Sequence, residues 1–212
     1  MSNFSIRFIS SIIILPIFLL MNYFYSSFIF LLISLLVISI YELLIFFKKK
    51  KYCTFFLLNI LIIFFIFCFL KVRGQSQNFN ENLLWIFIIV WMTDIGGYIV
   101  GNIIKGPKLC IWSPNKTISG FLGSIFFSQL SFLIVNLIIE YKFTYSYKIF
   151  LIQFFFSIIS IIGDLFFSFI KRLSSIKDYS NIIPGHGGLL DRIDSLIFAI
   201  IAMYLFKIFN VL

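Results

Sequence analysis

Residues 27–47 read SFIFLLISLLVISIYELLIFF, and this apolar run indicates the fold class of the whole chain. A helix needs roughly 20 apolar residues to cross the hydrocarbon core of a bilayer, and the run has about that length. Its apolar residues are continuous rather than alternating, which favours a helix over a strand of a membrane barrel. Four consecutive lysines, residues 48–51, follow the run directly.

Similar runs recur along the chain, in which 61% of the 212 residues are hydrophobic and 12% are charged. So few charges cannot cover the surface of a water-soluble globule, and we therefore expect an integral membrane protein. The expected fold is all-α and polytopic, with seven transmembrane helices in one membrane domain over residues 1–212. The predicted spans are residues 6–22, 27–47, 53–70, 83–101, 117–139, 148–170 and 189–209.

The basic residues favour one side of the membrane. Loops rich in lysine and arginine stay in the cytoplasm, and placing residues 48–51 there brings most of the 17 basic residues to the same side. The N-terminus and the glycine- and proline-containing loops then face the cytoplasm. The net charge of +9 has two interpretations: it sets topology and attracts anionic lipids, or part of it binds phosphate. Neither requires a nucleic acid partner.

Polar residues concentrate in the stretch KRLSSIKDYSNIIPGHGGLLDRIDS, residues 171–195. Asp164 precedes this stretch inside the apolar layer, where a carboxylate costs at least ~2.5 kcal/mol. It should therefore be paired, bound to a metal or directed into a polar cavity. Ser168, Lys171 and Arg172 follow it on the same helix face, at i+4, i+7 and i+8. An intramembrane ion pair with a basic residue of another helix is the alternative for Asp164.

The last predicted span begins with two further aspartates, Asp191 and Asp194, which share a helix face. Neighbouring carboxylates repel each other unless a cation lies between them. Hard cations such as Mg²⁺ bind carboxylates together with substrate phosphates, so Asp164, Asp191 and Asp194 are candidate Mg²⁺ ligands. A second, monovalent or divalent, cation is left open. The simpler interpretation is that a helix N-terminus favours acids, which explains one of the two aspartates.

A glycine-rich turn, PGHGG at residues 184–188, lies between the two polar helix ends. Its N–H groups can approach an anion closely, and the helix N-terminus that follows also favours phosphate. The turn, the carboxylates and the nearby basic residues together indicate a site for metal-bound polyphosphate. Three roles stay open for His186: a donor to phosphate, an acid or base, or a residue that holds the loop. The basic residues around the turn are Lys171, Arg172, Lys177 and Arg192.

A second polar segment, TDIGGYIVGNIIKGPKLCIWSPNKTISG, has a similar composition. It places Asp94 in a predicted helix that we expect Gly96 and Gly97 to loosen. Ser113 begins a turn, Lys116 and Thr117 can bind phosphate, and Thr117 or Ser119 can cap the next helix. The residue order of a P-loop is absent. Pairing with a loop lysine is the alternative role for Asp94.

Residues 168–194, SFIKRLSSIKDYSNIIPGHGGLLDRID, closely resemble the signature of phosphatidate cytidylyltransferases, also called CDP-diacylglycerol synthases. The shared elements are a serine, a Lys-Arg pair, Lys-Asp, the Pro-Gly-His-Gly-Gly turn and Asp-Arg-x-Asp. TDIGGYIVG and SPNKTISG are also similar to that family's other loop, so the resemblance covers about half of the chain. The chain departs from the family pattern at Asn102, Asn115 and Ser119, where basic, basic and acidic residues are usual.

The resemblance implies a magnesium-dependent enzyme that transfers a cytidylyl group from CTP to phosphatidate, giving CDP-diacylglycerol and pyrophosphate for phospholipid biosynthesis. It also implies a homodimer in the bacterial inner membrane with a cytoplasmic active site, in which residues 83–212 supply the catalytic spans and loops and residues 1–82 the N-terminal spans. The implied catalytic residues are Asp164, Asp191, Asp194, Lys171 and His186, of which the three aspartates bind the metal. The residues implied to bind CTP and its phosphates are Ser168, Arg172, Lys177, Asp178, Gly187, Gly188, Arg192, Asp94, Ser113, Lys116 and Thr117.

Two other functions stay open. A CTP-dependent lipid kinase of the polyprenol or phytol type also binds polyphosphate at the cytosolic face of a membrane. An ion-coupled transporter also carries aspartates inside apolar helices, although it needs no basic, glycine-rich loop beside them. The phosphotransferases that consume CDP-diacylglycerol are disfavoured, because their motif requires Asp-Gly and this dipeptide is absent from the chain.

Overall fold

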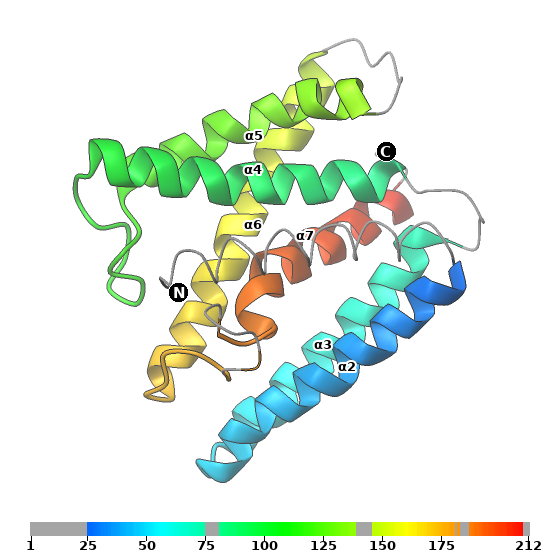
Figure 1. Cartoon of the computed structure of the whole chain (residues 1–212), viewed down its shortest axis with the longest axis vertical. Coiled ribbons are helices and arrows are strands. Elements are labelled where there is room, and N and C mark those ends of the chain that lie inside the picture. The colour runs from blue at the N-terminus through cyan, green and yellow to red at the C-terminus, as the bar shows by residue number, and fades with distance from the viewer. Residues whose placement is uncertain (1–24, 75–80, 139–145, 181, 183–186, 210–212) are drawn as a thin grey trace, which may run out of the picture. The chain divides into compact units, whose positions relative to one another are not determined.

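The computed structural model describes residues 25–74, 81–138, 146–180, 182 and 187–209, and their regular structure is helical apart from isolated bridge residues such as the pair Lys108 and Thr117 (Figure 1). The predicted spans from 27–47 onward are confirmed as helices to within three residues at each end. The first predicted span, residues 6–22, lies outside the described residues. The helices are α2 (Tyr25–Lys48), α3 (Tyr52–Arg73), α4 (Glu81–Ile104), α5 (Ile118–Ile138), α6 (Tyr147–Leu173) and α7 (Leu190–Ile208).

Five of the helices in the described part, α2 to α6, are long and apolar enough to cross a membrane. Within the described residues, helices account for the backbone hydrogen bonds of these apolar segments, as a spanning segment in lipid requires. The chain is therefore a helical membrane protein. Helix α7 is not one of the five, because Asp191, Arg192 and Asp194 occupy its first turns. The total of seven spans stays a prediction.

The chain divides into two compact units, each built from two separate segments. The first unit comprises Met1–Asn80 and Ile170–Asp194, and the second comprises Glu81–Phe169 and Ser195–Leu212. Helices α6 and α7 contribute to both units. The single membrane domain over residues 1–212 stays a prediction.

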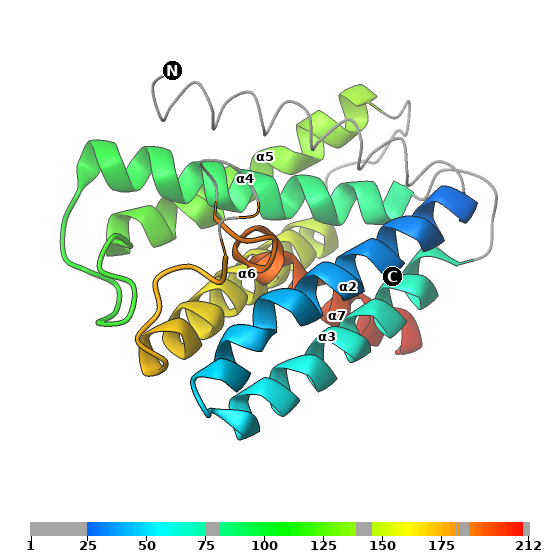
Figure 2. The same ribbon diagram turned by 60° about the horizontal axis from the view of Figure 1, so that its bottom comes forward.

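In the first unit, α2 and α3 form an antiparallel hairpin (Figure 2). Three lysines connect the helices, and the middle one, Lys50, has a φ of 58°, which turns the chain back within so short a link. Aromatic rings fill the hairpin: Phe28 and Phe69 pack edge to face with centroids 5.0 Å apart, and both are buried. Such ring pairs add about 0.5–1.5 kcal/mol beyond the burial of their area.

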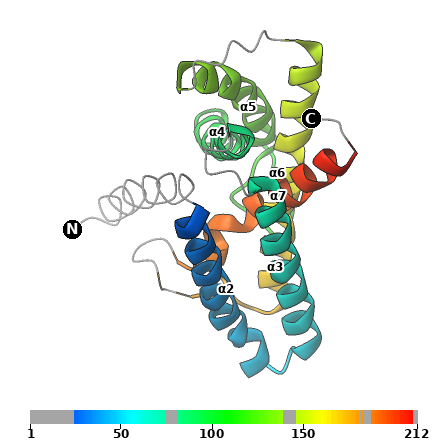
Figure 3. The same ribbon diagram turned by 90° about the vertical axis from the view of Figure 1, so that its right-hand side faces the viewer.

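In the second unit, α4 and α5 pack closely side by side, through glycines (Figure 3). A Cβ atom on Gly96 would lie 2.6 Å from the carbonyl oxygen of Gly123, and one on Gly123 would lie 2.4 Å from Cβ of Val100. Small residues at helix contacts let backbones approach in this way in membranes. The expectation that Gly96 and Gly97 loosen the helix is wrong, because α4 is unbroken and these glycines form its contact with α5.

Helices α5 and α6 of the second unit are joined by a polar contact inside the apolar layer. Gln153 Nε2 donates to Ser131 Oγ at 2.6 Å, and both side chains are fully buried. Interhelical hydrogen bonds of this kind contribute about 0.6–2 kcal/mol in membranes. Phe206 of α7 stacks on Phe155 of α6 at 4.8 Å, so α6 is held from two sides in this unit.

Candidate active site

Asp191, in the first turn of α7, accepts hydrogen bonds at both carboxylate oxygens. Lys171 Nζ donates to Oδ1 at 2.6 Å, while the backbone N–H groups of Tyr179 and Gly188 donate to Oδ2 at 3.0 Å. The Asp191 side chain is 6% exposed and that of Lys171 is 12% exposed, so the ion pair is shielded from water. Asp191 thus connects the end of α6, the loop after it and the glycine turn.

Tyr179 lies at the centre of this arrangement. Lys171 Nζ lies 5.4 Å from its ring centroid, and the Phe46 ring lies 5.8 Å away on the side of α2. Burial raises the pKa of Tyr179 well above its usual range, and the nearby charges of Asp191, Asp194 and Glu42 raise it further. The phenol therefore stays neutral at physiological pH, and Lys171 brings a positive charge to this part of the site.

Glu42 of α2 is a site residue that the sequence analysis did not identify. Its side chain is buried, and it accepts the Ser180 hydroxyl at 2.6 Å and the N–H groups of Leu189 and Leu190 at 2.7 and 2.8 Å. The signal was present in the sequence, since Glu42 is the only acid in the apolar run 27–47, and ionisable residues inside such runs mark functional sites.

The acids change the expected role of the α7 N-terminus. The first N–H groups of a helix have no partner within the helix and are free to bind an anion. Here the N–H groups of Gly188, Leu189 and Leu190 donate to the carboxylates of Asp191 and Glu42. These three donors are used inside the protein, so a bound phosphate would depend on the basic side chains of the surrounding loop.

In the second unit, Lys116 forms an ion pair with Asp164 of α6. Ser168 Oγ also donates to Asp164, at 3.4 Å, which places the predicted Asp164–Ser168 face in one polar cluster with the loop lysine. The structure thus pairs Asp164 with a basic residue, but with a lysine of the loop before α5 rather than with one of another helix, as the alternative had it. The Lys116 and Asp164 side chains are 28% and 26% exposed, so solvent still reaches the pair.

The loop between α4 and α5 is folded by short-range contacts around Lys116. Leu109 N–H donates to the carbonyl oxygen of Lys116 at 2.8 Å, and Lys116 N–H closes a turn on Ser113 at 3.1 Å. Thr117 Oγ1 accepts the N–H of Gly120 at 3.0 Å, which confirms Thr117 as the cap of α5. The turn predicted at Ser113 is likewise present.

The remaining predicted residues differ in burial. Asp194 is buried at 7% exposure, and a Cβ on Gly187 would lie 3.3 Å from Asp191 Oδ2 and 3.6 Å from Asp178 Cβ, so Asp178 and Asp191 converge on that glycine. His186 lies outside the described residues. The exposed candidates are Asp94, Arg172, Lys177, Asp178 and Arg192.

The carboxylates have the chemistry of a magnesium site, because hard cations prefer carboxylate oxygens. Asp191 keeps a lone pair beyond its three hydrogen bonds, and atoms of both Asp178 and Asp191 lie within 3.6 Å of the position that a Cβ on Gly187 would take. Among the described residues, however, no three His, Cys, Asp or Glu side chains are grouped closely enough to hold a metal. Asp164 belongs to the second unit, so its predicted common site with Asp191 and Asp194 stays a prediction.

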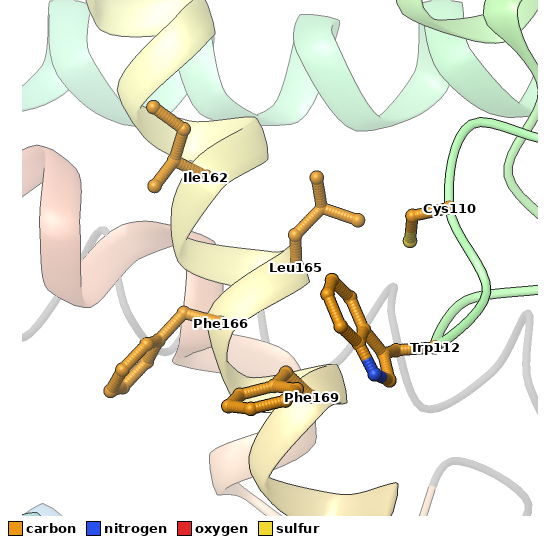
Figure 4. A pocket seen from close by; sticks show the side chains of 6 residues that line it. All are labelled: Cys110, Trp112, Ile162, Leu165, Phe166 and Phe169. Carbon is orange, nitrogen blue, oxygen red and sulfur yellow. The ribbon is translucent and has the colours of Figure 1, made fainter.

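An apolar pocket of about 270 Å³ lies on α6 in the second unit (Figure 4). Trp112 covers one end of it and packs edge to face on Phe169, with ring centroids 4.8 Å apart. Its lining is hydrocarbon, aromatic and thiol, so it does not suit a phosphate group. The lining residues are Cys110, Trp112, Ile162, Leu165, Phe166 and Phe169.

Two lysines of the 48–51 run bind the end of α6 rather than only setting orientation. Lys49 Nζ donates to the carbonyl oxygens of Ser174 and Ser175 at 2.9 and 3.1 Å, and Lys51 Nζ donates to that of Leu173. The last carbonyls of a helix have no partner within it, and positive charge there is favourable.

Lys49→Gln is therefore expected to lower stability by about 1 kcal/mol, the net value of one such hydrogen bond. Lys48→Gln is the matched control, since it makes the same chemical change one residue earlier and should leave both stability and activity nearly unchanged. Thermal unfolding of the two variants in detergent measures the difference. Equal effects of the two substitutions would contradict a specific role for Lys49.

The chain belongs to the cytidylyltransferase family, whose model matches residues 3–209. It is 37% identical over 139 residues to a phosphatidate cytidylyltransferase of Bacillus subtilis (strain 168), which corresponds to 64% of this chain and 51% of that protein. It is 38% identical over 136 residues to the phosphatidate cytidylyltransferase of Staphylococcus aureus (strain COL), which corresponds to 62% and 50% of the two chains. The chain thus spans about half the length of the curated relatives it matches.

Proposed function

We propose that this protein transfers the cytidylyl group of CTP to phosphatidate and so makes CDP-diacylglycerol and pyrophosphate for phospholipid synthesis. One observation carries the proposal: Asp191 and Lys171 form a shielded ion pair against the glycine turn of the family signature. The names of the relatives support the same substrates. The two other functions considered, a lipid kinase and a transporter, are separated from it by the assay below.

In the proposed reaction, a phosphate oxygen of phosphatidate attacks the α-phosphorus of CTP. The new bond joins that oxygen to the α-phosphorus, and the bond from the α-phosphorus to the β-phosphate breaks, so that pyrophosphate leaves with the electron pair. The attacking oxygen is already ionised near neutral pH, and no strong general base is needed. The protein's contribution is to hold two anions in line and to offset the developing charge.

The basic residues of the loop between α6 and α7 are proposed to contact the nucleotide phosphates. Lys171 is held by Asp191 and by the ring of Tyr179, which fixes its ammonium group before substrate arrives. Arg172, Lys177 and Arg192 are exposed, and we propose that they turn toward the polyphosphate on binding. In the second unit, Lys116 is proposed to contact a nucleotide phosphate, with Ser113 and Thr117.

We propose Mg²⁺ as the cofactor, held by Asp164, Asp191 and Asp194, with a second cation left open. A bound Mg²⁺ would polarise the α-phosphoryl oxygen and neutralise the leaving pyrophosphate. Removal of divalent ions with EDTA is expected to abolish turnover, and added Mg²⁺ should restore it while added Na⁺ does not. Full activity in the presence of excess EDTA would contradict the assignment.

The protein is proposed to work as a homodimer in the bacterial inner membrane, with the N-terminus and the site on the cytoplasmic side. The lysines at 48–51 and the basic loops favour this orientation. Both substrates are then accessible, because CTP is soluble in the cytosol and phosphatidate lies in the inner leaflet. Labelling of the exposed Cys53 by a membrane-impermeant thiol reagent, in right-side-out and inverted vesicles, tests the orientation.

The deciding experiment incubates detergent-purified protein with CTP and Mg²⁺, in one reaction with phosphatidate and in another with a polyprenol. Formation of CDP-diacylglycerol and pyrophosphate in equal amounts is the expected result. Release of CDP with phosphorylation of a prenol would instead identify a lipid kinase. Ion-coupled uptake by proteoliposomes without any nucleotide turnover would identify a transporter.

A further inference from the structure

Glu42 binds both ends of the loop segment that runs from Ser180 to the start of α7. We propose that Glu42, on helix α2, holds Ser180 and the start of α7 in the arrangement in which the Lys171 side chain meets the phosphates of CTP. It is a positioning residue, because it reaches the site through the backbone of that loop. The inference rests on the proposed function and extends it to the N-terminal helices, for which the sequence analysis predicted only spans.

The Glu42 carboxylate accepts three hydrogen bonds from the loop and from the start of α7. Oε1 accepts from Ser180 Oγ at 2.6 Å and from Leu189 N–H at 2.7 Å, and Oε2 accepts from Leu190 N–H at 2.8 Å. These donors lie at the two ends of the loop, so one carboxylate fastens both ends to α2. The donors are a hydroxyl and two amides, and the carboxylate caps α7 from another helix.

Asp191 binds the same loop, at the residues next to those that Glu42 binds. It accepts the N–H groups of Tyr179 and Gly188, each next in sequence to a residue that Glu42 binds. The loop is therefore held at each end by both acids. Since Asp191 also pairs with Lys171, a shift of the loop away from Glu42 would move the Lys171 ammonium as well.

The Glu42 carboxylate occupies the space beside Gly188. A Cβ atom on Gly188 would lie 2.8 Å from Oε1 of Glu42 and 3.0 Å from its Oε2 and Cδ. A side chain at position 188 would therefore displace the Glu42 carboxylate from its hydrogen bonds, whereas at Gly187 the backbone itself, with a φ of 85°, favours glycine. The small size of Gly188, a residue of the signature stretch, thus leaves room for a side chain of α2.

A buried acid at position 42 is costly. Glu42 is 2% exposed and lies six residues before Lys48 on an apolar helix, about 9 Å along the axis from the end of the run. A charged side chain within a span is expensive and is retained where it serves a site. A loop that must hold still while binding a highly charged ligand is such a use.

Glu42→Gln tests the proposal, because the amide keeps the size of the side chain but opposes one of the three donors with an N–H₂ group. It is expected to raise the KM for CTP about tenfold, equivalent to ~1.4 kcal/mol, while the KM for phosphatidate changes less than about twofold. Glu42→Asp keeps the charge and should recover part of the loss. Glu81→Gln is the matched control for removing one carboxylate, on α4 and outside the proposed site, and should leave both constants unchanged.

Hydrogen exchange of residues 187–195 gives a readout that does not depend on turnover. Faster exchange there in Glu42→Gln, with the rest of the protein unchanged, is the expected result. Ser180→Ala is a milder variant that removes one donor and serves if Glu42→Gln does not fold. An unchanged KM for CTP with unchanged exchange would overturn the proposal, and so would equal losses for both substrates with faster exchange throughout.

Binding of CTP to the wild-type protein, measured by calorimetry, separates the two proposals. Binding that weakens in Glu42→Gln, without any transfer to phosphatidate by the wild type, would overturn the proposed function and leave the role of Glu42 supported. Transfer by the wild type at a rate and a KM for CTP that Glu42→Gln leaves unchanged would support the proposed function and overturn the role of Glu42. Absence of CTP binding by the wild type would overturn both.

Discussion

Asp191→Asn is expected to lower turnover at least 100-fold, a barrier increase of ~2.7 kcal/mol. The native carboxylate accepts from Lys171 at one oxygen and from the N–H groups of Tyr179 and Gly188 at the other. An asparagine amide has one oxygen, so its N–H₂ group must face either the ammonium or the two amides. Steady-state rates of CDP-diacylglycerol formation measure the effect.

Glu81→Gln again serves as the control for a lost carboxylate, since Glu81 lies in the first turn of α4 and outside the proposed site. The folded state of both variants should be checked by gel filtration in detergent, because loss of a buried ion-pair partner also destabilises. Retention of more than about a tenth of the wild-type rate, a change below ~1.4 kcal/mol, would remove Asp191 from the proposed machinery.

Gly123→Val is expected to destabilise the second unit by about 3 kcal/mol, at the upper end of the usual cost of overpacking. The new Cβ would lie 2.4 Å from Cβ of Val100 and 2.9 Å from the backbone oxygen of Gly96, so α4 and α5 must move apart. Because the loop with Lys116 joins these two helices, activity should fall with stability. Thermal unfolding in detergent and the yield of monodisperse protein measure the loss of stability.

Leu133→Val is the control for Gly123→Val, because it also introduces a β-branched residue on α5 at a position that is 56% exposed. It should shift the melting temperature little. If Gly123→Val unfolded at the same temperature as this control, the close contact between α4 and α5 would not be a feature of the protein in its membrane.

The helices were largely predictable from the sequence, because the length of an apolar run that must cross lipid is a physical constraint of its own. The runs at 27–47 and 148–170 correspond to α2 and α6, and the structure extends α6 by one turn through Lys171 and Arg172. Basic residues in a last helical turn are favoured by the dipole, and for this reason the helix continues past its apolar part.

The candidate site was predictable where its residues lie close in sequence. Lys171, Gly188 and Asp191 belong to one signature stretch, and the structure brings them together. The contact between Glu42 and Leu190 joins residues 148 positions apart, and no local pattern indicates such a partner. The expectation that Gly96 and Gly97 loosen α4 is wrong for a related reason. A glycine can loosen a helix or allow a second helix to pack closely, and the local sequence does not show whether a second helix is present.

The discontinuous make-up of the first unit has a consequence for biosynthesis. Its α2–α3 hairpin emerges from the ribosome long before Ile170–Asp194, the segment that completes the unit. During that interval Glu42 carries a carboxyl group into the insertion machinery before Ser180, Leu189 and Leu190 exist to satisfy it. Helix α2 is therefore expected to settle fully in the lipid only after translation has passed residue 190, which makes insertion of the hairpin a late event although its sequence comes early.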